Sequence, residues 1–310
     1  MKRKVIKQGN GTLKITLPKQ WTREVGLKGG DEIDVGEDGK NIVIGGKHGF
    51  ASETTIKLSS KEIPEDKDKN PNRYTIRTIV INALRKGHNK VRILFDSPKA
   101  LHIINSCLDE VLGYEIIEQS SKHCIIDCVV DLKYTDFIKH FIRFRHAVLN
   151  FSNLIYKNLM QNEDNKEEIE STFLMLEKNY NSFCRFLMYN CKTDTKEKIY
   201  LFTTAEHMYQ GARNMFYCSQ LYNEMNSKLS KSTLNYTKEV FDYVNRVIEF
   251  ITTKDISKVS NLNIMKNTLT YHEINKIICS NSKENNILLQ LSFIARRMWD
   301  AVGPYVGYII

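Results

Sequence analysis

Basic side chains gather at the beginning of this 310-residue chain. Residues 1–28 hold eight lysines and arginines and one acid, Glu24, which gives the segment a charge of +7 out of a formal +9 for the whole chain. Ammonium and guanidinium groups at this density bind the phosphates of a nucleic-acid backbone. The segment is therefore a candidate nucleic-acid interface, and the alternative is a solvated basic face without a ligand.

Sequence motifs of catalysis are missing. The chain has no HExxH, no nucleophile elbow and no dinucleotide fingerprint. Gly46-Lys47 is followed by His48, and Asn41 stands where a P-loop needs its first glycine. His140, Arg143 and His146 share a predicted helix, and a solvated face of that helix accounts for them. We expect a protein that is not an enzyme.

The basic N-terminus is not followed by an apolar stretch, and no run approaches the roughly 18 apolar residues of a membrane-spanning helix. We expect a cytoplasmic protein without a membrane span, in a reducing compartment. The 7 cysteines show no CxxC spacing, so we interpret them as small buried hydrophobic thiols rather than zinc or redox sites.

The basic segment belongs to a β-rich unit over residues 1–47. Alternating residues predict a hairpin of strands 3–7 and 12–17, and a second hairpin of strands 31–37 and 41–45 around Asp38-Gly39. A short helix between the hairpins is expected to begin at Pro18 and to end at Gly26. Such short elements cannot bury a core alone, so we expect a second copy of the chain to interleave with them.

Residues 48–73 are polar and predict a linker, or a weak strand near Thr55 to Leu58 followed by a linker. Residues 74–131 alternate between helical and strand periodicity, which predicts a compact αβαββ domain. Its expected elements are a helix over 74–87, a strand over 91–95, a helix over 98–112 and strands over 114–119 and 123–130.

Residues 132–310 predict a helical bundle. Apolar residues step by three and four along 137–159 and again along 169–187, which is typical of bundle helices. Further helices are expected over 196–228, 236–252, 256–280 and 284–308, the last kinked or ended at Gly303-Pro304. The third and sixth helices share a pattern at an offset of 90, AEHMYQG at 205–211 and ARRMWDA at 295–301, which predicts two three-helix repeats.

These elements predict an α+β multidomain protein that is mostly α. The run Leu17-Pro18-Lys19-Gln20-Trp21, followed by Gly26-Leu27-Lys28-Gly29-Gly30-Asp31, resembles the SpoVT/AbrB family over nearly all of residues 3–45. The resemblance implies a DNA-binding swapped-hairpin β-barrel built by a homodimer. It assigns DNA contact to the basic residues of the first hairpin and short helix, Arg3, Lys4, Lys7, Lys14, Lys19 and Arg23.

Residues 73–310 resemble the archaeal phosphate uptake regulators, in which an AbrB-like domain precedes a PhoU-like bundle. The signature helix of PhoU proteins carries a Glu-Arg-x-x-Asp run that binds divalent or iron-type metal clusters in some members. Glu206 and Asp300 match that run, and we name them as candidate metal ligands, together with the neighbouring pair Glu177 and Asn181. Other positions depart from it: His207 and Gln210 replace arginine and aspartate in the first copy, and Arg296 replaces glutamate in the second.

Because each copy has lost part of its ligands, we expect no bound cofactor, with Glu206, His207 and Asp300 as polar helix residues. The function expected from the sequence is a DNA-binding transcriptional regulator of phosphate uptake. Its bundle would sense a partner, such as a phosphate-transporter subunit or a signalling protein. The alternatives are a dimeric adaptor of a phosphate transport system that does not bind DNA, and a metal-binding sensor of PhoU type.

Overall fold

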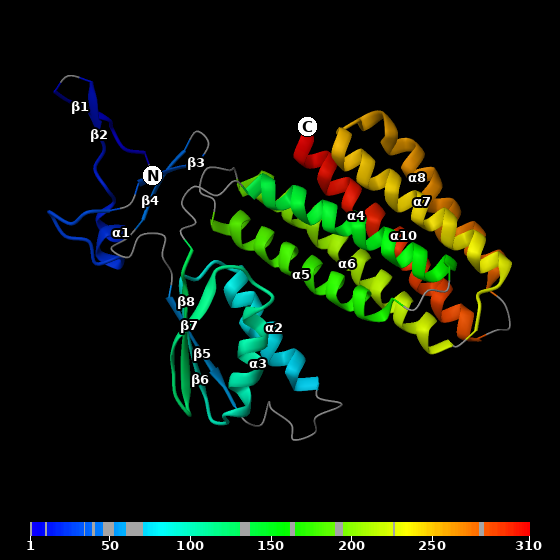
Figure 1. Ribbon diagram of the computed structural model, residues 1–310. Coiled ribbons are helices and arrows are strands. Elements are labelled where there is room, and N and C mark those ends of the chain that lie inside the picture. The colour runs from blue at the N-terminus through cyan, green and yellow to red at the C-terminus, as the bar shows by residue number, and fades with distance from the viewer. Residues whose placement is uncertain are drawn as a thin grey trace.

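A computed structural model of the chain describes residues 2–9, 11–33, 35–38, 41–45, 53–59, 71–130, 137–161, 165–189, 195–225, 227–278 and 282–310. Most of them are helical, with a small sheet in the middle of the chain and a bundle of long helices at its end (Figure 1).

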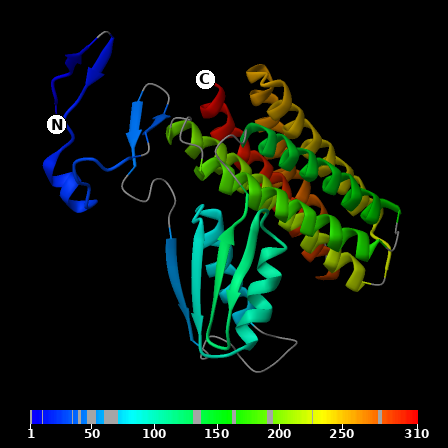
Figure 2. The same cartoon turned by 60° about the vertical axis from the view of Figure 1, so that its left-hand side comes forward.

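Two hairpins and a short helix make up the N-terminal segment, residues 2–45. Its elements are β1 (Ile6–Gln8), β2 (Thr12–Lys14), α1 (Lys19–Glu24), β3 (Val35–Asp38) and β4 (Asn41–Ile44). Each hairpin is its own two-stranded antiparallel sheet, and no closed barrel forms among the described residues of a single chain. The segment stands to one side of the other elements in both ribbon views (Figures 1 and 2).

The predicted hairpins and helix are present, with shorter strands than expected. Pro18 precedes the helix as its N-cap instead of filling its first position, since its ψ of 126° is extended. Gly26 has a φ of +67° and ends the helix as predicted, because only glycine adopts that conformation without strain. Gly39 of the expected second turn lies outside the described residues.

A four-stranded sheet with two helices forms the sheet domain, residues 53–130. Its elements are β5 (Glu53–Leu58), α2 (Pro71–Arg85), β6 (Lys90–Phe95), α3 (Lys99–Leu108), β7 (Tyr114–Gln119) and β8 (His123–Cys128). The strand order is β5-β6-β8-β7, with β5 parallel to β6 and the other neighbours antiparallel.

The strand β5 corrects the domain boundary that the sequence predicted. Of the two alternatives for residues 48–73, the strand near Thr55 to Leu58 is confirmed, since Glu53–Leu58 pair along their whole length with β6, and only the domain boundary changes. The predicted αβαββ domain therefore gains a strand before its first helix. Its order of elements from residue 53 onward is βαβαββ. The helix that was expected to begin at residue 74 begins at Pro71. A polar strand such as ETTIKL carries a weak sequence signal, because its alternate side chains face water at a sheet edge.

One face of the sheet is covered and the other is open. Val91 and Ile93 are fully buried in a core shared with α2 and α3, whereas Arg92 between them is exposed. Both helices lie on the same side of the sheet (Figure 2). We refer to the opposite side, which carries Arg92, as the open face.

The bundle contains α4 (Phe137–Gln161), α5 (Lys166–Tyr189), α6 (Thr195–Met225), α7 (Lys231–Thr253) and α10 (Ser282–Ile309). Between α7 and α10 the chain forms a 3-10 turn η2 (Ile256–Lys258), α8 (Val259–Asn267), a π-helical segment η3 (Thr268–Glu273) and α9 (Ile274–Ile277). The apolar stripes predicted over 137–159 and 169–187 are buried in one core, as expected.

The helix expected over 256–280 is present as an unbroken run of helical residues, 256–277, and ends three residues early. Its changes of helix type, a 3-10 turn at η2 and a π-helical segment at η3, were not predicted by the apolar spacing. The last helix, expected over 284–308, is confirmed as α10, and Pro304 lies inside it without ending it. Of the cysteines, Cys107, Cys124, Cys184 and Cys218 are buried thiols and Cys128 is half-buried. Cys191 and Cys279 lie outside the described residues.

The two helices that carry the repeated pattern pack against each other. Tyr200 of α6 lies against Gly307 of α10, and Asn214 of α6 donates to Gln290 at 2.8 Å, so the two helices run antiparallel. Gly211 faces Met298 at the crossing. The offset of 90 makes Ala301 and Met208 the counterparts of this pair, and both are fully buried. A small residue opposite a methionine thus lets the helices approach closely.

No helix among the described residues is long and apolar enough to cross a membrane.

The crossing of α6 and α10 predicts a strong effect at Gly211. A Cβ atom built there would lie 3.1 Å from the sulfur of Met298. We expect Gly211→Leu to lower the free energy of unfolding by about 1–3 kcal/mol, because a larger side chain overpacks the core. Urea unfolding followed by far-UV circular dichroism measures this change.

Gly303→Ala is the matched control, since a Cβ at this helical glycine meets nothing within 4 Å. Its effect should stay below about 1 kcal/mol. Equal midpoints for the two variants would show that α6 and α10 do not cross closely at Gly211.

Candidate nucleic-acid interface and the polar cluster between sheet domain and bundle

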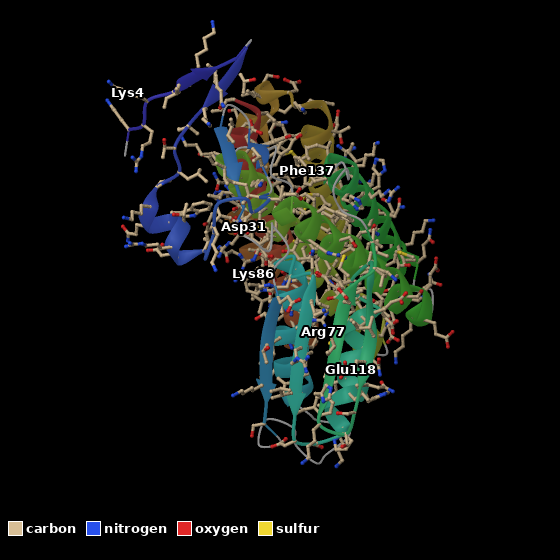
Figure 3. All side chains as sticks on the ribbon, turned by 90° about the vertical axis from the view of Figure 1, so that its left-hand side faces the viewer. Lys4, Asp31, Arg77, Lys86, Glu118 and Phe137 are labelled. Carbon is tan, nitrogen blue, oxygen red and sulfur yellow. The ribbon has the colours of Figure 1, made fainter. Side chains whose placement is uncertain are left out.

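The six basic residues assigned to DNA contact are all exposed. Arg3 and Lys4 precede β1, Lys7 and Lys14 lie in the two strands of the first hairpin, and α1 carries the last two, Lys19 and Arg23. Figure 3 shows Lys4 among side chains that project from the N-terminal segment into solvent. No acidic side chain is paired with any of the six among the described residues.

The hairpin register separates two of these lysines. Lys7 lies directly opposite Leu13, and Lys14 lies directly opposite Ile6. Residues directly opposite each other share a face, and neighbours along a strand alternate, so Lys7 and Lys14 point to opposite faces of the hairpin. A single flat surface of this hairpin therefore presents one of the two lysines, which the sequence pattern alone did not reveal.

In contrast, α1 brings two cations together. Lys19 and Arg23 are four residues apart in the helix and so lie on one face. On the neighbouring face Gln20 donates to Glu24 at 3.0 Å, which ties up the only acid of this helix. The face of α1 with Lys19 and Arg23 is therefore cationic, and the exposed carboxylate of Glu24 lies on the neighbouring face.

Apolar side chains of the N-terminal segment are as exposed as the basic ones. None of its described apolar side chains belongs to a buried core. The side chains that are between 53 % and 70 % exposed are Val5, Ile6, Leu13, Ile15, Val35 and Ile42. Covering such a side chain is worth about 1 kcal/mol. The segment thus exposes apolar side chains that could form a core only if a second layer of protein covered them.

The candidate metal ligands lie in a different setting, and their surroundings do not fit a metal cluster. Glu206 accepts a hydrogen bond from the Tyr180 hydroxyl and another from Gln210 Nε2 at 2.6 Å. Asp300 lies 3.6 Å from the guanidinium of Arg297. No three His, Cys, Asp or Glu side chains come together as a metal site in the described part of the chain.

Glu177 and Asn181 meet arginines instead of a metal. The Glu177 carboxylate accepts from Arg77 at 3.1 Å and from the Tyr209 hydroxyl at 2.5 Å. Asn181 accepts from Arg85 Nε at 2.7 Å. Both arginines come from α2, so the sheet domain supplies cations to the place where the resemblance implied metal ions.

Further contacts join the same two parts of the chain. Arg77 also forms a two-pronged ion pair with Glu110, with its Nε at 2.8 Å from the carboxylate. Asn181 donates to the carbonyl oxygen of Glu110 at 2.8 Å. Arg185 of α5 donates to the Leu112 carbonyl, contacts Cys128 Sγ at 2.6 Å and lies over the ring of Tyr114. Together these groups form the interdomain cluster, Arg77, Arg85, Glu110, Tyr114, Glu177, Tyr180, Asn181, Arg185, Glu206 and Tyr209.

Burial sets the protonation of this cluster. Burial works to lower the pKa of Arg77, and its carboxylate partners Glu110 and Glu177 outweigh this and raise it. Burial raises the pKa of Glu110, although the Arg77 hydrogen bond opposes the shift. Burial likewise raises the pKa of the Tyr180 and Tyr209 hydroxyls. The tyrosines therefore remain protonated and act as hydrogen-bond donors to carboxylates.

The second repeat has opposite chemistry at its surface. Arg296, which stands at the counterpart of Glu206, lies over the ring of Tyr271 at 6.0 Å. Lys266 lies over the rings of Tyr271 and Trp299 at 5.6 and 5.5 Å. The π-helical segment η3 holds Tyr271. The two repeats thus share their packing and differ in charge.

The roles of the cluster's arginines could not be recognised from the sequence pattern. Arg77 and Arg85 lie about two turns apart on α2, but the helix also carries Arg73 and several polar residues, so their spacing alone was a weak signal. Arg185 follows the buried residues Phe183 and Cys184 of α5 and is itself 1 % exposed.

His140 was expected on a solvated face but is buried and stacks on Phe186 with ring centroids 3.9 Å apart. His207 has a buried Nδ1 without a hydrogen-bond partner among the described residues.

Comparison of the chain with protein-family models, with curated proteins and with solved structures finds no match.

Removal of Glu177 tests the interdomain cluster. Glu177→Ala leaves the Arg77 guanidinium and the Tyr209 hydroxyl without this partner, and Glu177 is only 7 % exposed. We expect a loss of about 2–3 kcal/mol in the free energy of unfolding, less than for a fully buried pair because Arg77 is partly solvated. Hydrogen exchange of the α2 amides should accelerate at the same time.

Asp242→Ala is the control, because Asp242 and Arg246 form a half-exposed pair one turn apart on α7. Its loss should cost under about 1 kcal/mol. If the two variants were equally stable and α2 exchanged as in the unaltered protein, the cluster would not hold the sheet domain on the bundle.

Proposed function

We propose that the protein is a homodimeric DNA-binding transcriptional regulator of phosphate uptake that acts in the cytoplasm. The observation that carries the proposal is the N-terminal segment, residues 2–45, in which the six basic side chains assigned to DNA contact are exposed together with six apolar ones. Cations favour a polyanion, and exposed apolar side chains favour a second protein layer. A dimer on DNA satisfies both needs.

Dimerisation follows from the apolar side chains. Covering six of them in each of two chains contributes of the order of 10 kcal/mol to the stability of the dimer. Short hairpins need such a contribution, because they are not stable on their own. Two copies of the segment would interleave as the SpoVT/AbrB resemblance implies, and the closed barrel would need hairpins from both chains. This arrangement doubles the cationic surface of the segment, whose charge is +7 within residues 1–28.

DNA contact follows from the cations and their geometry. The α1 face with Lys19 and Arg23 is cationic and exposed, and it is suited to phosphates. Lysine outnumbers arginine among the six assigned residues, which favours charge contact with the backbone over two-pronged recognition of bases. Of Lys7 and Lys14, the register permits one on the DNA side of the hairpin and leaves the other facing the opposite way.

The bundle is proposed to sense a partner, such as a phosphate-transporter subunit or a signalling protein. The interdomain cluster supports a mechanical link, because it fixes α2 of the sheet domain to α5. The link to phosphate rests on the motif resemblance of residues 73–310 to phosphate uptake regulators and on nothing else. Metal sensing is the weaker alternative, since arginines meet Glu177 and Asn181.

Charge reversal on α1 tests DNA binding. Lys19→Glu with Arg23→Glu replaces four cations in a dimer, and we expect at least an about 100-fold loss of affinity for duplex DNA. The slope of log affinity against log salt should flatten by roughly 4. Gel shift or fluorescence anisotropy over a salt series measures both quantities.

Lys57→Glu with Arg92→Glu is the matched control, because these residues are exposed on the sheet domain. This control should bind DNA as the unaltered chain does. A chain that never binds DNA but remains dimeric would support the adaptor instead.

Apolar contact in the dimer is tested separately. Leu13→Asp with Ile42→Asp places carboxylates at two side chains that are each 70 % exposed in the single chain. If a second copy covers them, the dimer dissociation constant should rise about 100-fold, since a buried unpaired carboxylate costs roughly 3 kcal/mol or more. Sedimentation equilibrium measures it.

Leu174→Asp, at a 55 % exposed leucine of α5, controls for the loss of an apolar surface residue elsewhere and should leave the dimer intact. A double variant that stays as dimeric as this control would place the interface outside the hairpins.

A further inference from the structure

The sheet domain has an edge strand that no described strand covers. The order β5-β6-β8-β7 leaves the outer edge of β7 unpaired among the described residues. Its sequence, YEIIEQ, contains no proline, which would remove a donor from the edge. A bulge between Ile116 and Glu118 leaves Ile117 54 % exposed. The edge has two features that usually protect against unspecific pairing, the bulge and the charges of Glu115 and Glu118, so a further strand must match both.

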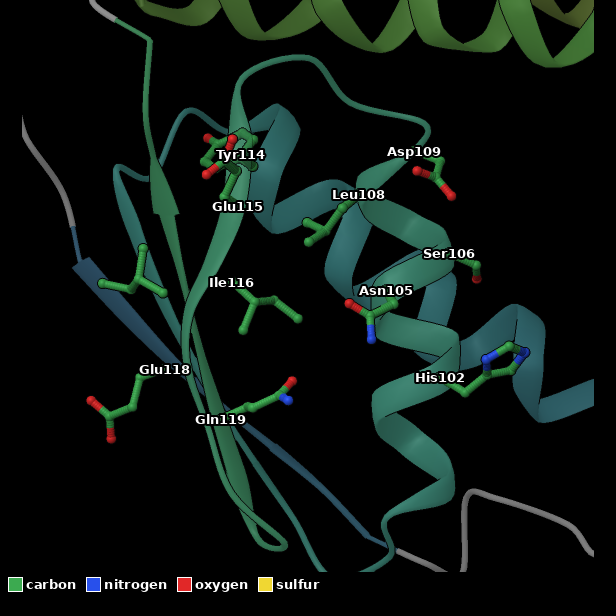
Figure 4. Close-up of a pocket in the computed structure, with 11 residues that line it drawn as sticks. His102, Asn105, Ser106, Leu108, Asp109, Tyr114, Glu115, Ile116, Glu118 and Gln119 are labelled. Carbon is green, nitrogen blue, oxygen red and sulfur yellow. The ribbon is translucent and has the colours of Figure 1, made fainter.

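A groove runs between β7 and α3 on the covered side of the sheet. It has a volume of about 820 Å³, and it extends along β7 from the covered side to the strand edge, lined also by residues of α3 and its C-terminal end. In Figure 4 Leu108 and Ile116 point into the space between strand and helix, and so do the amides of Asn105 and Gln119. Register agrees with the picture for Ile116 and Gln119, which lie opposite Ile126 and Cys124 of the core that α2 and α3 cover. The groove therefore offers apolar contact at Leu108 and Ile116 and hydrogen-bonding groups at the two amides.

The acidic residues of β7 face the other way. Glu118 points away from α3 in Figure 4. Glu115 lies opposite Asp127, and Glu118 lies opposite Ile125, whose neighbour across the sheet is the exposed Arg92. Glu115 and Glu118 therefore lie on the open face, at the edge of the sheet. His123 Nε2 donates to the Glu118 carboxylate at 2.7 Å, and this contact lowers the pKa of the Glu118 carboxyl.

Charges across the open face form an incomplete row. Glu53 of β5 pairs with Lys90 of β6 at 3.7 Å, Lys90 lies opposite Asp127 of β8, and Asp127 lies opposite Glu115 of β7. The row reads negative, positive, negative, negative. Like charges directly opposite each other are unfavourable, and a cation on the far side of Glu115 would relieve them. The position next to β7 is therefore suited to lysine or arginine.

We propose that the outer edge of β7 accepts an extended, basic segment of a partner protein as a fifth strand. Its alternate side chains would be apolar toward the groove beside Leu108 and Ile116, and cationic on the open face beside Glu115 and Glu118. Main-chain hydrogen bonds supply affinity in such strand addition, and the alternating pockets supply specificity. The period of two between apolar and cationic residues follows from the two faces of the strand.

A second copy of β7 does not fit this edge. Antiparallel pairing about the centre of EIIE would place Glu115 of one chain opposite Glu118 of the other and bring four carboxylates together. The occupant is therefore a strand of opposite charge. This surface lies in the sheet domain and shares no residue with the N-terminal segment that the proposed DNA contact uses.

The test uses the full chain and a short fluorescein-labelled peptide of alternating lysine and valine. Fluorescence anisotropy should show binding that is about tenfold tighter than that of the matched glutamate-valine peptide. A lysine-valine peptide with N-methyl groups on alternate amides should also bind about tenfold more weakly, because it lacks the donors for a sheet ladder. Hydrogen exchange should slow at the amides of residues 114–119 when the parent peptide is bound.

A charge swap locates the site. Glu115→Lys with Glu118→Lys should lose the lysine-valine peptide about tenfold and gain the glutamate-valine peptide by a similar factor. Glu167→Lys with Glu170→Lys, which alters two exposed acids of α5, should bind as the unaltered chain does. Circular dichroism confirms that each variant is folded.

Three results would each overturn the proposal. They are equal affinity for the two charged peptides, undiminished affinity for the N-methylated peptide, and no binding of the lysine-valine peptide below about 1 mM.

Discussion

The described residues of the N-terminal segment form no buried hydrophobic core, and the proposed function depends on this constraint. Two hairpins of three- and four-residue strands and a six-residue helix leave their apolar side chains on the surface. Because this surface lies beside a charge of +7, we propose that a second chain covers its apolar side chains. Dimerisation and nucleic-acid binding are both proposed for this one segment. Its apolar side chains need a second protein layer, and its basic side chains favour a polyanion.

The bundle is constrained in the opposite way. Its two repeats bury a continuous core, and α6 and α10 cross closely where Gly211 faces Met298. With packing satisfied internally, the surface chemistry of each repeat is free to differ. One repeat presents Glu177 and Asn181 to arginines of α2, and the other presents Lys266 and Arg296 over aromatic rings. Shared packing therefore says little about shared ligands.

The interdomain cluster gives the sheet domain a defined place on the bundle. Ion pairs and hydrogen bonds of partly buried groups are directional, and losing one partner leaves another group desolvated and unpaired. Apolar contact alone would tolerate sliding between α2 and α5. Arg77 and Arg85 of α2 contact Glu177 and Asn181, which lie one turn apart on α5, so the two helices are held together at two directional contacts.

The sequence by itself determined the elements whose signal is local. The apolar stripes of α4 and α5, the glycine that ends α1 and the repeat at an offset of 90 depend on spacing along the chain, and each is where the pattern predicted. It did not determine that Glu53–Leu58 pairs with β6, that Lys7 and Lys14 face opposite ways, or that α2 carries arginines to Glu177 and Asn181. Each of these depends on a partner distant in sequence or on a register. Only the tertiary structure, which sets the partner and the face, could decide them.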